Sequence, residues 1–356
     1  MAFSFSPDTF QRIKGRGAFT NPPNRFEPFY YLPDPGAVES ETIKTQVFRD
    51  TSKSIISSND SPDVGFDYSI NPYRGCEHGC IYCYARPTHE YLGFSSGLDF
   101  ESKIVVKEDA AKLLRITFLS KKWKPQVLAL SGVTDPYQPL EKKLKVTRSV
   151  LEVLTEFLNP VTIVTKSFLV TRDIDLLREL ARARAVAVGV SITTLDGGLQ
   201  RYLEPRAASA DRRLAAIEML ARADIPVRVL ISPVVPALND HEIPSILQAA
   251  SRAGAYGAEY MFLRLPGQLK DLFENWLDTH FPSKKKRILN QLRSLRSGQL
   301  NDPRFHFRMK GEGEYARQVQ SLFKNSCRRF DLNKVPLTLS TESYRRPHRF
   351  QMSLFD

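Results

Sequence analysis

Three of the chain's four cysteines lie within eight positions, in the stretch Asn71-Pro72-Tyr73-Arg74-Gly75-Cys76-Glu77-His78-Gly79-Cys80-Ile81-Tyr82-Cys83-Tyr84. Thiolates spaced in this way wrap around one soft metal centre, and iron–sulfur clusters and zinc are the usual occupants. The stretch offers three thiolates and not four. A cubane cluster held by three cysteines keeps one iron open, which lets the cluster act on a substrate.

Two other uses of the cysteines remain open. A structural zinc site needs four ligands, so His78 or His89 would have to complete a set of three cysteines and one histidine. The sequence has no second Cys-x-x-Cys pair. A disulfide is disfavoured because no secretory signal precedes the motif and because a chain of 356 residues with four cysteines is not a stapled mini-domain. Cys327 stands apart, and we assign it no role.

The spacing of Cys76, Cys80 and Cys83, with an aromatic residue directly before the last one, resembles the cluster motif of the radical S-adenosylmethionine (SAM) enzymes. The resemblance implies that these cysteines bind three irons of a [4Fe-4S] cluster, while the amine and carboxylate of SAM chelate the fourth. Tyr82 would lie against the adenine. One electron, from a donor such as flavodoxin or ferredoxin, then splits the sulfonium into methionine and a 5′-deoxyadenosyl radical, which abstracts a hydrogen atom.

The composition is that of a soluble globular protein, with 42% hydrophobic and 25% charged residues among 356. No apolar run approaches the length of a membrane span, and the first residues lack the plan of a signal peptide. We therefore expect a cytoplasmic protein with no membrane partner. A reducing compartment also suits free thiols and an oxygen-sensitive cluster.

The formal charge of +12 is concentrated near the C-terminus. From Lys284 to Asp356 the chain has 17 lysines and arginines against 6 aspartates and glutamates, a net charge of +11. Such an asymmetry is typical of proteins that bind nucleic acid, and a solvated basic tail is the alternative.

From Phe66 onward, short runs rich in β-branched residues alternate with amphipathic segments, which indicates parallel strands joined by helices. We expect strands at residues 66–70, 127–131, 161–165, 186–191, 227–232 and 259–263. We expect helices at residues 108–119, 141–158, 171–183, 210–223 and 241–253. Six such units are too few for a closed eight-stranded barrel. They agree with the open (β/α)6 partial TIM barrel that the radical SAM resemblance implies.

Four parts of the chain follow from this pattern. Residues 1–60 are rich in Gly and Pro and form an extended, partly disordered arm, which drapes on the barrel or touches nucleic acid. Residues 61–265 form the barrel. Residues 266–343 form a basic, mostly helical extension, with helices at 268–279, 284–297 and 313–327. Within it, residues 305–310 alternate like a short strand that closes one edge of the barrel, and residues 344–356 form an exposed tail.

In barrels of this kind the chemistry collects at the carboxyl ends of the strands, so polar residues in the following loops are candidates for binding SAM. After the second strand, family enzymes keep a segment that binds the methionyl amine, and an Asp-Pro turn with a helix cap is the alternative there. Lys166 suits the SAM carboxylate, Ser191 and Thr193 suit the ribose or carboxylate, and Arg206 either binds carboxylate or phosphate or caps the next helix. The full set of candidates is Tyr82, Ser131, Thr134, Asp135, Lys166, Ser191, Thr193 and Arg206.

Within the superfamily, three segments together resemble the spore photoproduct lyase-like group, also called DNA repair photolyases. The segments are Asn71–Cys76, Thr134-Asp135-Pro136-Tyr137-Gln138-Pro139 and Glu204-Pro205-Arg206. By position, Lys166 and Ser191 are similar to the lysine and serine that hold SAM in spore photoproduct lyase. That lyase has a further cysteine that returns a hydrogen atom to the repaired thymine, and residues 121–131 contain none here. The cofactor chemistry therefore transfers, and reversal of a thymine dimer does not follow.

The last residues contain a possible docking peptide. Gln351, Met352, Ser353, Leu354 and Phe355 resemble the peptide by which bacterial replication and repair proteins bind the DNA sliding clamp. The alternative is that Leu354 and Phe355 pack against the barrel.

The sequence thus favours a radical SAM enzyme, possibly a lyase, that repairs or modifies nucleic acid, and DNA is the favoured substrate. A radical SAM enzyme acting on RNA or on a peptide is the first alternative. The second is a zinc-stabilised protein that binds nucleic acid and catalyses no reaction.

Overall fold

A mostly parallel sheet forms the centre of the molecule in the computed structural model, which describes residues 13–27, 43–130 and 132–347. Its seven strands follow the order β10-β9-β8-β7-β6-β3-β2, and all are parallel except β2 at one edge. The strands are β2 (Ile56–Ser58), β3 (Tyr68–Ile70), β6 (Leu128–Leu130), β7 (Val161–Thr165), β8 (Val186–Ser191), β9 (Val227–Val234) and β10 (Gly257–Phe262).

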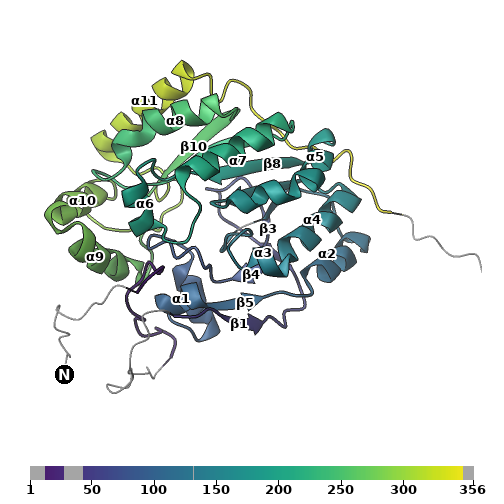
Figure 1. Cartoon of the computed structure of the whole chain (residues 1–356), viewed down its shortest axis with the longest axis horizontal. Helices are drawn as coiled ribbons and strands as arrows, with labels where there is room; N and C mark the ends of the chain where they lie inside the picture. The colour runs from purple at the N-terminus through teal and green to yellow at the C-terminus, as the bar shows by residue number, and fades with distance from the viewer. Residues whose placement is uncertain (1–12, 28–42, 131, 348–356) are drawn as a thin grey trace, which may run out of the picture.

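Five helices connect the parallel strands and follow one another around the sheet (Figure 1). They are α2 (Ala110–Leu119), α4 (Val146–Phe157), α5 (Ile174–Arg182), α7 (Ala210–Arg222) and α8 (Ile243–Arg252). Every residue of the central strand β8 is buried, because helices cover its outer side and the barrel interior covers the other. The predicted partial barrel is therefore confirmed, and each of the six predicted strands has its counterpart.

One predicted helix is in fact two. Residues 141–158 form α3 (Glu141–Leu144) and α4, because Lys145 has a left-handed backbone conformation with φ of 56°. The buried carboxylate of Glu141 accepts hydrogen bonds from the backbone N–H groups of Thr147 and Arg148 at the start of α4. Glu141 thus satisfies backbone donors that a continuous helix would bond internally, which explains the break.

Apart from β3, the elements before the first barrel helix were not predicted. A second, three-stranded sheet has the order β1-β5-β4, with β1 (Gln46–Arg49), β4 (Tyr73–Arg74) and β5 (Lys103–Val106). A 3₁₀ helix, η2 (Arg86–Leu92), and the short helix α1 (Leu98–Ser102) join the cysteine loop to β5. Two further 3₁₀ helices precede α5 and α8, namely η3 (Phe168–Asp173) and η4 (Asp240–Glu242).

The basic extension forms three helices, α9 (Leu269–His280), α10 (Pro282–Ser294) and α11 (Gly313–Arg329). The prediction of a strand at residues 305–310 is wrong. His306 has φ of 68°, and the backbone N–H groups of Arg308 and Gly311 bond back four residues, so the segment forms turns. The backbone N–H of Phe262 in the last barrel strand nevertheless donates to the Met309 carbonyl at 3.1 Å, so the segment does lie at the barrel edge.

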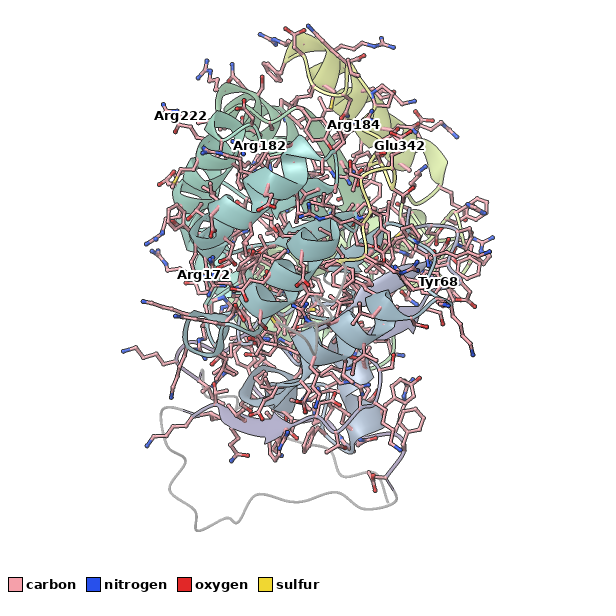
Figure 2. The ribbon with its side chains drawn as sticks, turned by 90° about the vertical axis from the view of Figure 1, so that its right-hand side faces the viewer. Tyr68, Arg172, Arg182, Arg184, Arg222 and Glu342 are labelled. Atoms are coloured by element: carbon pink, nitrogen blue, oxygen red, sulfur yellow. The ribbon has the colours of Figure 1, made fainter. Side chains whose placement is uncertain are left out.

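The chain beyond α11 returns across the amino ends of the barrel strands. The backbone N–H of Ser340 donates to the Arg184 carbonyl just before β8, and that of Arg345 donates to the Phe157 carbonyl before β7, each at 2.9 Å. Figure 2 shows Arg184 and Glu342 side by side on this face, where their side chains form an ion pair of 2.9 Å. Residues 348–356, which include the clamp-like peptide, lie outside the described residues.

Among the described residues, no helix combines the length and the apolar character that crossing a bilayer requires.

Candidate functional site

The cysteine loop begins directly after β3, at the carboxyl edge of the sheet. Gly75 and Gly79 have φ of 78° and 67°, conformations that favour glycine. A methyl group on Gly75 would also meet the Phe100 carbonyl at 2.9 Å, and the backbone N–H of Cys76 donates to that same carbonyl. The two glycines therefore let the chain fold back tightly and carry three cysteines on one loop.

The three cysteine side chains are free thiols, of which Cys76 and Cys80 are buried and Cys83 is half-buried. Burial raises the pKa of Cys76, Cys80 and Cys83, and the nearby Asp135 carboxylate and the other two sulfurs raise that of Cys76 further. The thiols are therefore protonated in the free protein, and binding of a metal centre would release their protons.

The structure gives the zinc alternative no fourth ligand of the expected kind. His78 lies against Asp135, with 3.3 Å between Nδ1 and Oδ2, and the Nε2 of His89 lies 2.9 Å from the Lys103 carbonyl oxygen. Within residues 13–27, 43–130 and 132–347, no three His, Cys, Asp or Glu side chains converge closely enough to hold one metal ion. An iron–sulfur cluster does not need this convergence, since each thiolate binds a different iron.

Part of the N-terminal arm packs directly on the cysteine loop. A methyl group built on Gly17 would lie 1.9 Å from the Gly79 carbonyl oxygen, so the two backbones are in direct contact. The buried Glu101 carboxylate holds the arm there by accepting hydrogen bonds from the backbone N–H groups of Gly17 and Ala18, each at 2.9 Å. Arg16 donates to the backbone carbonyl of Glu101 at 2.6 Å. The N-terminal arm thus helps to hold the cysteine loop in place.

Arg86 connects the same carboxylate to the cysteines. Its guanidinium is fully buried and paired with Glu101, and its Nε and Nη2 donate to the Cys80 carbonyl at 3.0 and 2.8 Å. A buried, hydrogen-bonded ion pair of this kind fixes the backbone path between the second and third cysteines.

The loop after β6 is hydrogen-bonded to the cysteine loop. The Thr134 hydroxyl donates to the Gly75 carbonyl at 2.7 Å, and the Gln138 side chain donates to the same carbonyl and accepts from the Glu77 backbone N–H. Thr134 therefore supports the loop backbone. The predicted Ser131 lies outside the described residues.

Asp135 joins the cysteine loop to the next strand. Its carboxylate accepts hydrogen bonds from the Thr165 hydroxyl and the Lys166 backbone N–H, each at 2.7 Å, and from the Tyr137 backbone N–H at 2.9 Å. Burial opposes ionisation, but His78 and these hydrogen bonds outweigh it and lower the pKa of Asp135 to about 2. The carboxylate is thus charged and occupied by protein partners, and a role in positioning the loop accounts for it.

The structure brings Lys166 and Ser191 together at the carboxyl ends of β7 and β8. The Lys166 ammonium donates to the Ser191 hydroxyl at 3.0 Å and lies 5.7 Å from the centre of the Tyr82 ring. Among the described residues, no carboxylate lies within 4 Å of that ammonium, as an ion pair would require. The site therefore presents a cation, a hydroxyl and an aromatic ring beside the loop that carries the thiols.

A buried polar network lies beneath this pair. The Tyr82 hydroxyl donates to Glu204, Thr193 donates to the same carboxylate at 2.6 Å, and Arg213 forms a buried ion pair with it. Burial opposes ionisation of Glu204, but Arg213, Lys166 and the hydrogen bonds lower its pKa to about 2. The network fixes the Tyr82 ring against the barrel.

Sequence reasoning quoted Glu204 within a motif and assigned it no role. The signal that could have found it is a carboxylate directly after a short helix, with an arginine nine residues later in the next helix. Arg206, which was a candidate, donates to the Glu77 carboxylate at 3.2 Å. It does not cap α7, because the Ser209 side chain accepts from the Arg212 backbone N–H and takes that role.

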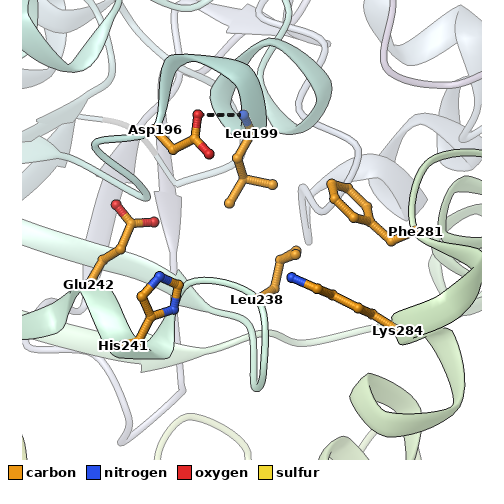
Figure 3. Close-up of a pocket in the computed structure, with 7 residues that line it drawn as sticks. All are labelled: Asp196, Leu199, Leu238, His241, Glu242, Phe281 and Lys284. Atoms are coloured by element: carbon orange, nitrogen blue, oxygen red, sulfur yellow. Dashed lines mark hydrogen bonds between the residues drawn. The ribbon is translucent and has the colours of Figure 1, made fainter.

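A pocket of roughly 330 Å³ lies between the loops that follow β8 and β9 and helix α10 (Figure 3). Its two carboxylates are already occupied: Asp196 caps the short helix α6 (Gly197–Leu203), and Glu242 accepts from the Thr194 hydroxyl and the Leu195 backbone N–H. None of the predicted SAM contacts lines it. The chemistry of the cysteine loop therefore does not depend on this pocket.

Comparison with known proteins gives matches in both sequence and fold. The family model for the Radical SAM superfamily matches residues 70–250. An uncharacterized protein of Mycobacterium tuberculosis is 36% identical over 219 residues, which cover 61% of this chain and 64% of that protein. An uncharacterized protein of Methanocaldococcus jannaschii is 30% identical over 227 residues, covering 64% and 81%. The chain thus spans less than two thirds of the mycobacterial relative.

Among solved structures, spore photoproduct lyase complexed with dinucleoside spore photoproduct matches with a TM-score of 0.57 at 16% identity, covering 80% of this chain and 79% of that one. A cysteine-to-serine mutant of the same lyase matches with a TM-score of 0.56 at 17% identity, covering 80% of this chain and 78% of that one. At this level of identity the likeness shows a shared fold.

Proposed function

Because the chain belongs to the radical SAM superfamily, we propose that Cys76, Cys80 and Cys83 hold a [4Fe-4S] cluster at which SAM is bound and reductively cleaved. When bound, the cluster and SAM together supply a 5′-deoxyadenosyl radical that abstracts a hydrogen atom from the substrate. Three free thiols, two of them buried and one half-buried, on a loop whose path depends on two glycines support this assignment.

The observation that carries the proposal is the cation–hydroxyl pair beside the cysteine loop. The Lys166 ammonium, with no carboxylate partner within 4 Å among the described side chains, binds the carboxylate of SAM by a charge-assisted hydrogen bond. The Ser191 hydroxyl, which donates to the Ser232 carbonyl at 3.2 Å in this structure, donates a second hydrogen bond to SAM when it rotates toward the ligand. Tyr82, held by Glu204, presents its ring to the adenine. Thr134 and Asp135 act indirectly by holding the loop backbone.

The substrate we favour is nucleic acid, and DNA in particular. The net charge of +11 over the last 73 residues favours a polyanionic partner, and the shared fold includes a lyase solved with a dinucleoside photoproduct. We do not extend dimer reversal to this chain, because residues 121–131 contain no cysteine that could return a hydrogen atom. Cys327 lies on α11, outside the barrel loops. RNA or a peptide is the alternative substrate.

The C-terminal peptide Gln351–Phe355 is proposed to tether the protein to the DNA sliding clamp. Residues 340–346, which precede this peptide, lie along the amino ends of the strands, opposite the cysteine loop. A tether raises the local concentration of an enzyme near DNA without any new catalytic contact. A cytoplasmic flavodoxin or ferredoxin is the proposed electron donor.

Anaerobic purification followed by metal analysis and incubation with SAM and dithionite tests the proposal. We expect a brown protein with about four irons per chain that converts SAM into 5′-deoxyadenosine. A colourless protein that binds one zinc ion and leaves SAM intact would replace the enzyme with the zinc-stabilised binding protein.

A further inference from the structure

The open side of the partial barrel is bridged by residues 304–310, which we call the closing turn. The Met309 carbonyl accepts from the backbone N–H of Phe262 in the last barrel strand at 3.1 Å. On the other side, the Asp63 carboxylate, from the segment that precedes β3, accepts from the His306 backbone N–H and from Arg308. The closing turn therefore connects the two edges of the sheet. A large substrate would reach the barrel interior through the gap between these edges.

This turn exposes two aromatic rings although it holds the barrel together. Phe305 and Phe307 are 43% and 42% exposed. The guanidinium of Arg308 lies 4.5 Å from the centre of the Phe305 ring, and that of Arg304 lies 4.8 Å from the centre of the Phe307 ring. Exposed aromatic rings are surfaces on which unpaired bases stack. The two flanking arginines are already ion-paired, Arg308 with Asp63 and Arg304 with Asp302 and Glu312, so the charge that meets a phosphate has to come from neighbouring arginines.

Beside the closing turn lie two arginines whose charge the described residues do not neutralise by an ion pair. Arg264 follows β10, and its Nε is buried without a hydrogen-bond partner. Arg296 is 1% exposed, and its Nε and Nη1 also lack partners. Burial, together with the positive charge of Arg264, lowers the pKa of Arg296 to about 10. Unpaired buried donors and like charges both disfavour the free protein, and a bound anion would relieve both.

Arg264 also connects this region to the cysteine loop. Its guanidinium lies 3.7 Å from the Met309 sulfur in the closing turn and 5.9 Å from the centre of the Tyr84 ring. Tyr84 directly follows Cys83 and is 47% exposed, and its hydroxyl donates to the Gly132 carbonyl at 2.7 Å. The half-buried Arg264 thus connects the closing turn to the exposed ring of Tyr84, the residue after the last cysteine.

We infer that Tyr84, Arg264, Phe305 and Phe307, here named the gap surface, bind an unpaired segment of nucleic acid next to the cysteine loop. Bases stack on the two phenylalanines, and a backbone phosphate binds Arg264, with Arg296 behind it adding to the positive field. Duplex bases are already stacked on each other, so the rings select single-stranded or flipped-out nucleotides. This inference rests on the proposed nucleic-acid substrate and adds where and in what form it binds.

Fluorescence anisotropy with a labelled oligothymidylate of roughly 12 nucleotides, a length within the usual range of single-strand sites, tests the inference. The full-length, anaerobically reconstituted protein is used without SAM, and the same strand annealed to its complement serves as the duplex. We expect tighter binding of the single strand. Phe305→Ala and Phe307→Ala should each weaken it about fivefold or more. The matched control is Leu322→Ala, which removes a side chain of similar exposure, 40%, from α11.

Arg264→Gln should weaken binding and lower the slope of log K against log salt by about 0.7, the value of one phosphate contact with a single strand. Arg317→Gln, which removes one exposed, ion-paired charge from α11, controls for the change in net charge. The melting temperature of Arg264→Gln should stay the same or rise, because the variant removes a charge without an ion-pair partner. A marked fall would instead assign Arg264 to the fold.

The outcomes separate this inference from the proposed function. If the wild type binds the single strand and all three variants bind it equally well, the gap surface is wrong and a nucleic-acid substrate stands. Equal binding of duplex and single strand would overturn the stacking role. If the wild type binds neither oligonucleotide, the nucleic-acid substrate itself fails.

Discussion

The contact between Gly17 and Gly79 makes a sharp prediction about how the N-terminal arm supports the cysteine loop. In Gly17→Ala the added methyl carbon would lie 1.9 Å from the Gly79 carbonyl oxygen, whereas real contacts of this kind stay above 3.0 Å. The two backbones must therefore separate by about 1.1 Å, a gap that follows directly from those two distances. Both atoms belong to the backbone, so no side-chain rotation relieves the clash.

The expected loss of stability follows from the hydrogen bonds that this separation of the two backbones breaks. The backbone N–H groups of Gly17 and Ala18 donate to the buried Glu101 carboxylate, and hydrogen bonds to charged groups contribute about 1.5–3 kcal/mol each. Overpacking costs roughly 1–3 kcal/mol in addition when the structure yields only in part. Taking the lower end of each range, we expect a loss of stability of about 4 kcal/mol or more, concentrated at the cysteine loop.

The assay is iron content after anaerobic reconstitution, together with thermal unfolding and limited proteolysis of the arm. Gly17→Ala should retain less iron than wild type and should be cleaved faster within its first 45 residues. Gly65→Ala is the matched control, because a methyl group there meets nothing within 4 Å. If Gly17→Ala matched wild type in iron content and protease resistance, the arm would not be a structural part of the loop.

Three further predictions concern SAM, the buried network and the tail. Lys166→Ala and Ser191→Ala should each weaken SAM binding by roughly 1–3 kcal/mol in calorimetric titration with iron content unchanged, and an unaltered affinity would exclude both from the SAM site. Because the pKa of Glu204 is lowered to about 2 from 4.5, its contribution to stability is present above about pH 4.5 and is lost as the pH falls toward 2. In urea unfolding, Glu204→Gln should be less stable than wild type by about 3 kcal/mol at neutral pH, and the two proteins should become more similar in acid. A stability difference that does not change with pH would contradict the assignment. Leu354→Ala and Phe355→Ala should each weaken binding of the full-length protein to purified sliding clamp by about 1–2 kcal/mol or more, and no binding by wild type would remove the tether.

The sequence predicted the parts of the molecule that repeat a local pattern. The six parallel strands and their helices follow from hydrophobic periodicity, and β7 and β8 have the predicted bounds of 161–165 and 186–191. The cluster motif could also be predicted locally, since it consists of three cysteines within one loop. Lys166 and Ser191 were each predicted as SAM contacts at the ends of their strands, and the structure adds that their side chains are hydrogen-bonded to each other.

Contacts between distant parts of the chain were beyond a reading of the sequence. Glu101 contacts Gly17 and Arg86 at once, across 84 and 15 positions, and no periodicity marks any of the three. Residues 305–310 alternate like a strand, yet Asp63, more than 240 positions away, accepts from their backbone and stabilises turns. Tertiary hydrogen bonds overrode the local pattern in that segment.

The measurement that tests the central claim most directly is the yield of 5′-deoxyadenosine from SAM under dithionite, with iron content determined on the same samples. Wild type and Cys327→Ala should form the product and hold the same iron. Cys76→Ala, Cys80→Ala and Cys83→Ala should each lose both the cluster and the product, because in the proposed site each of the three thiolates binds a different iron. Continued cleavage of SAM by all three variants would show that the cysteine loop is not the site of the chemistry.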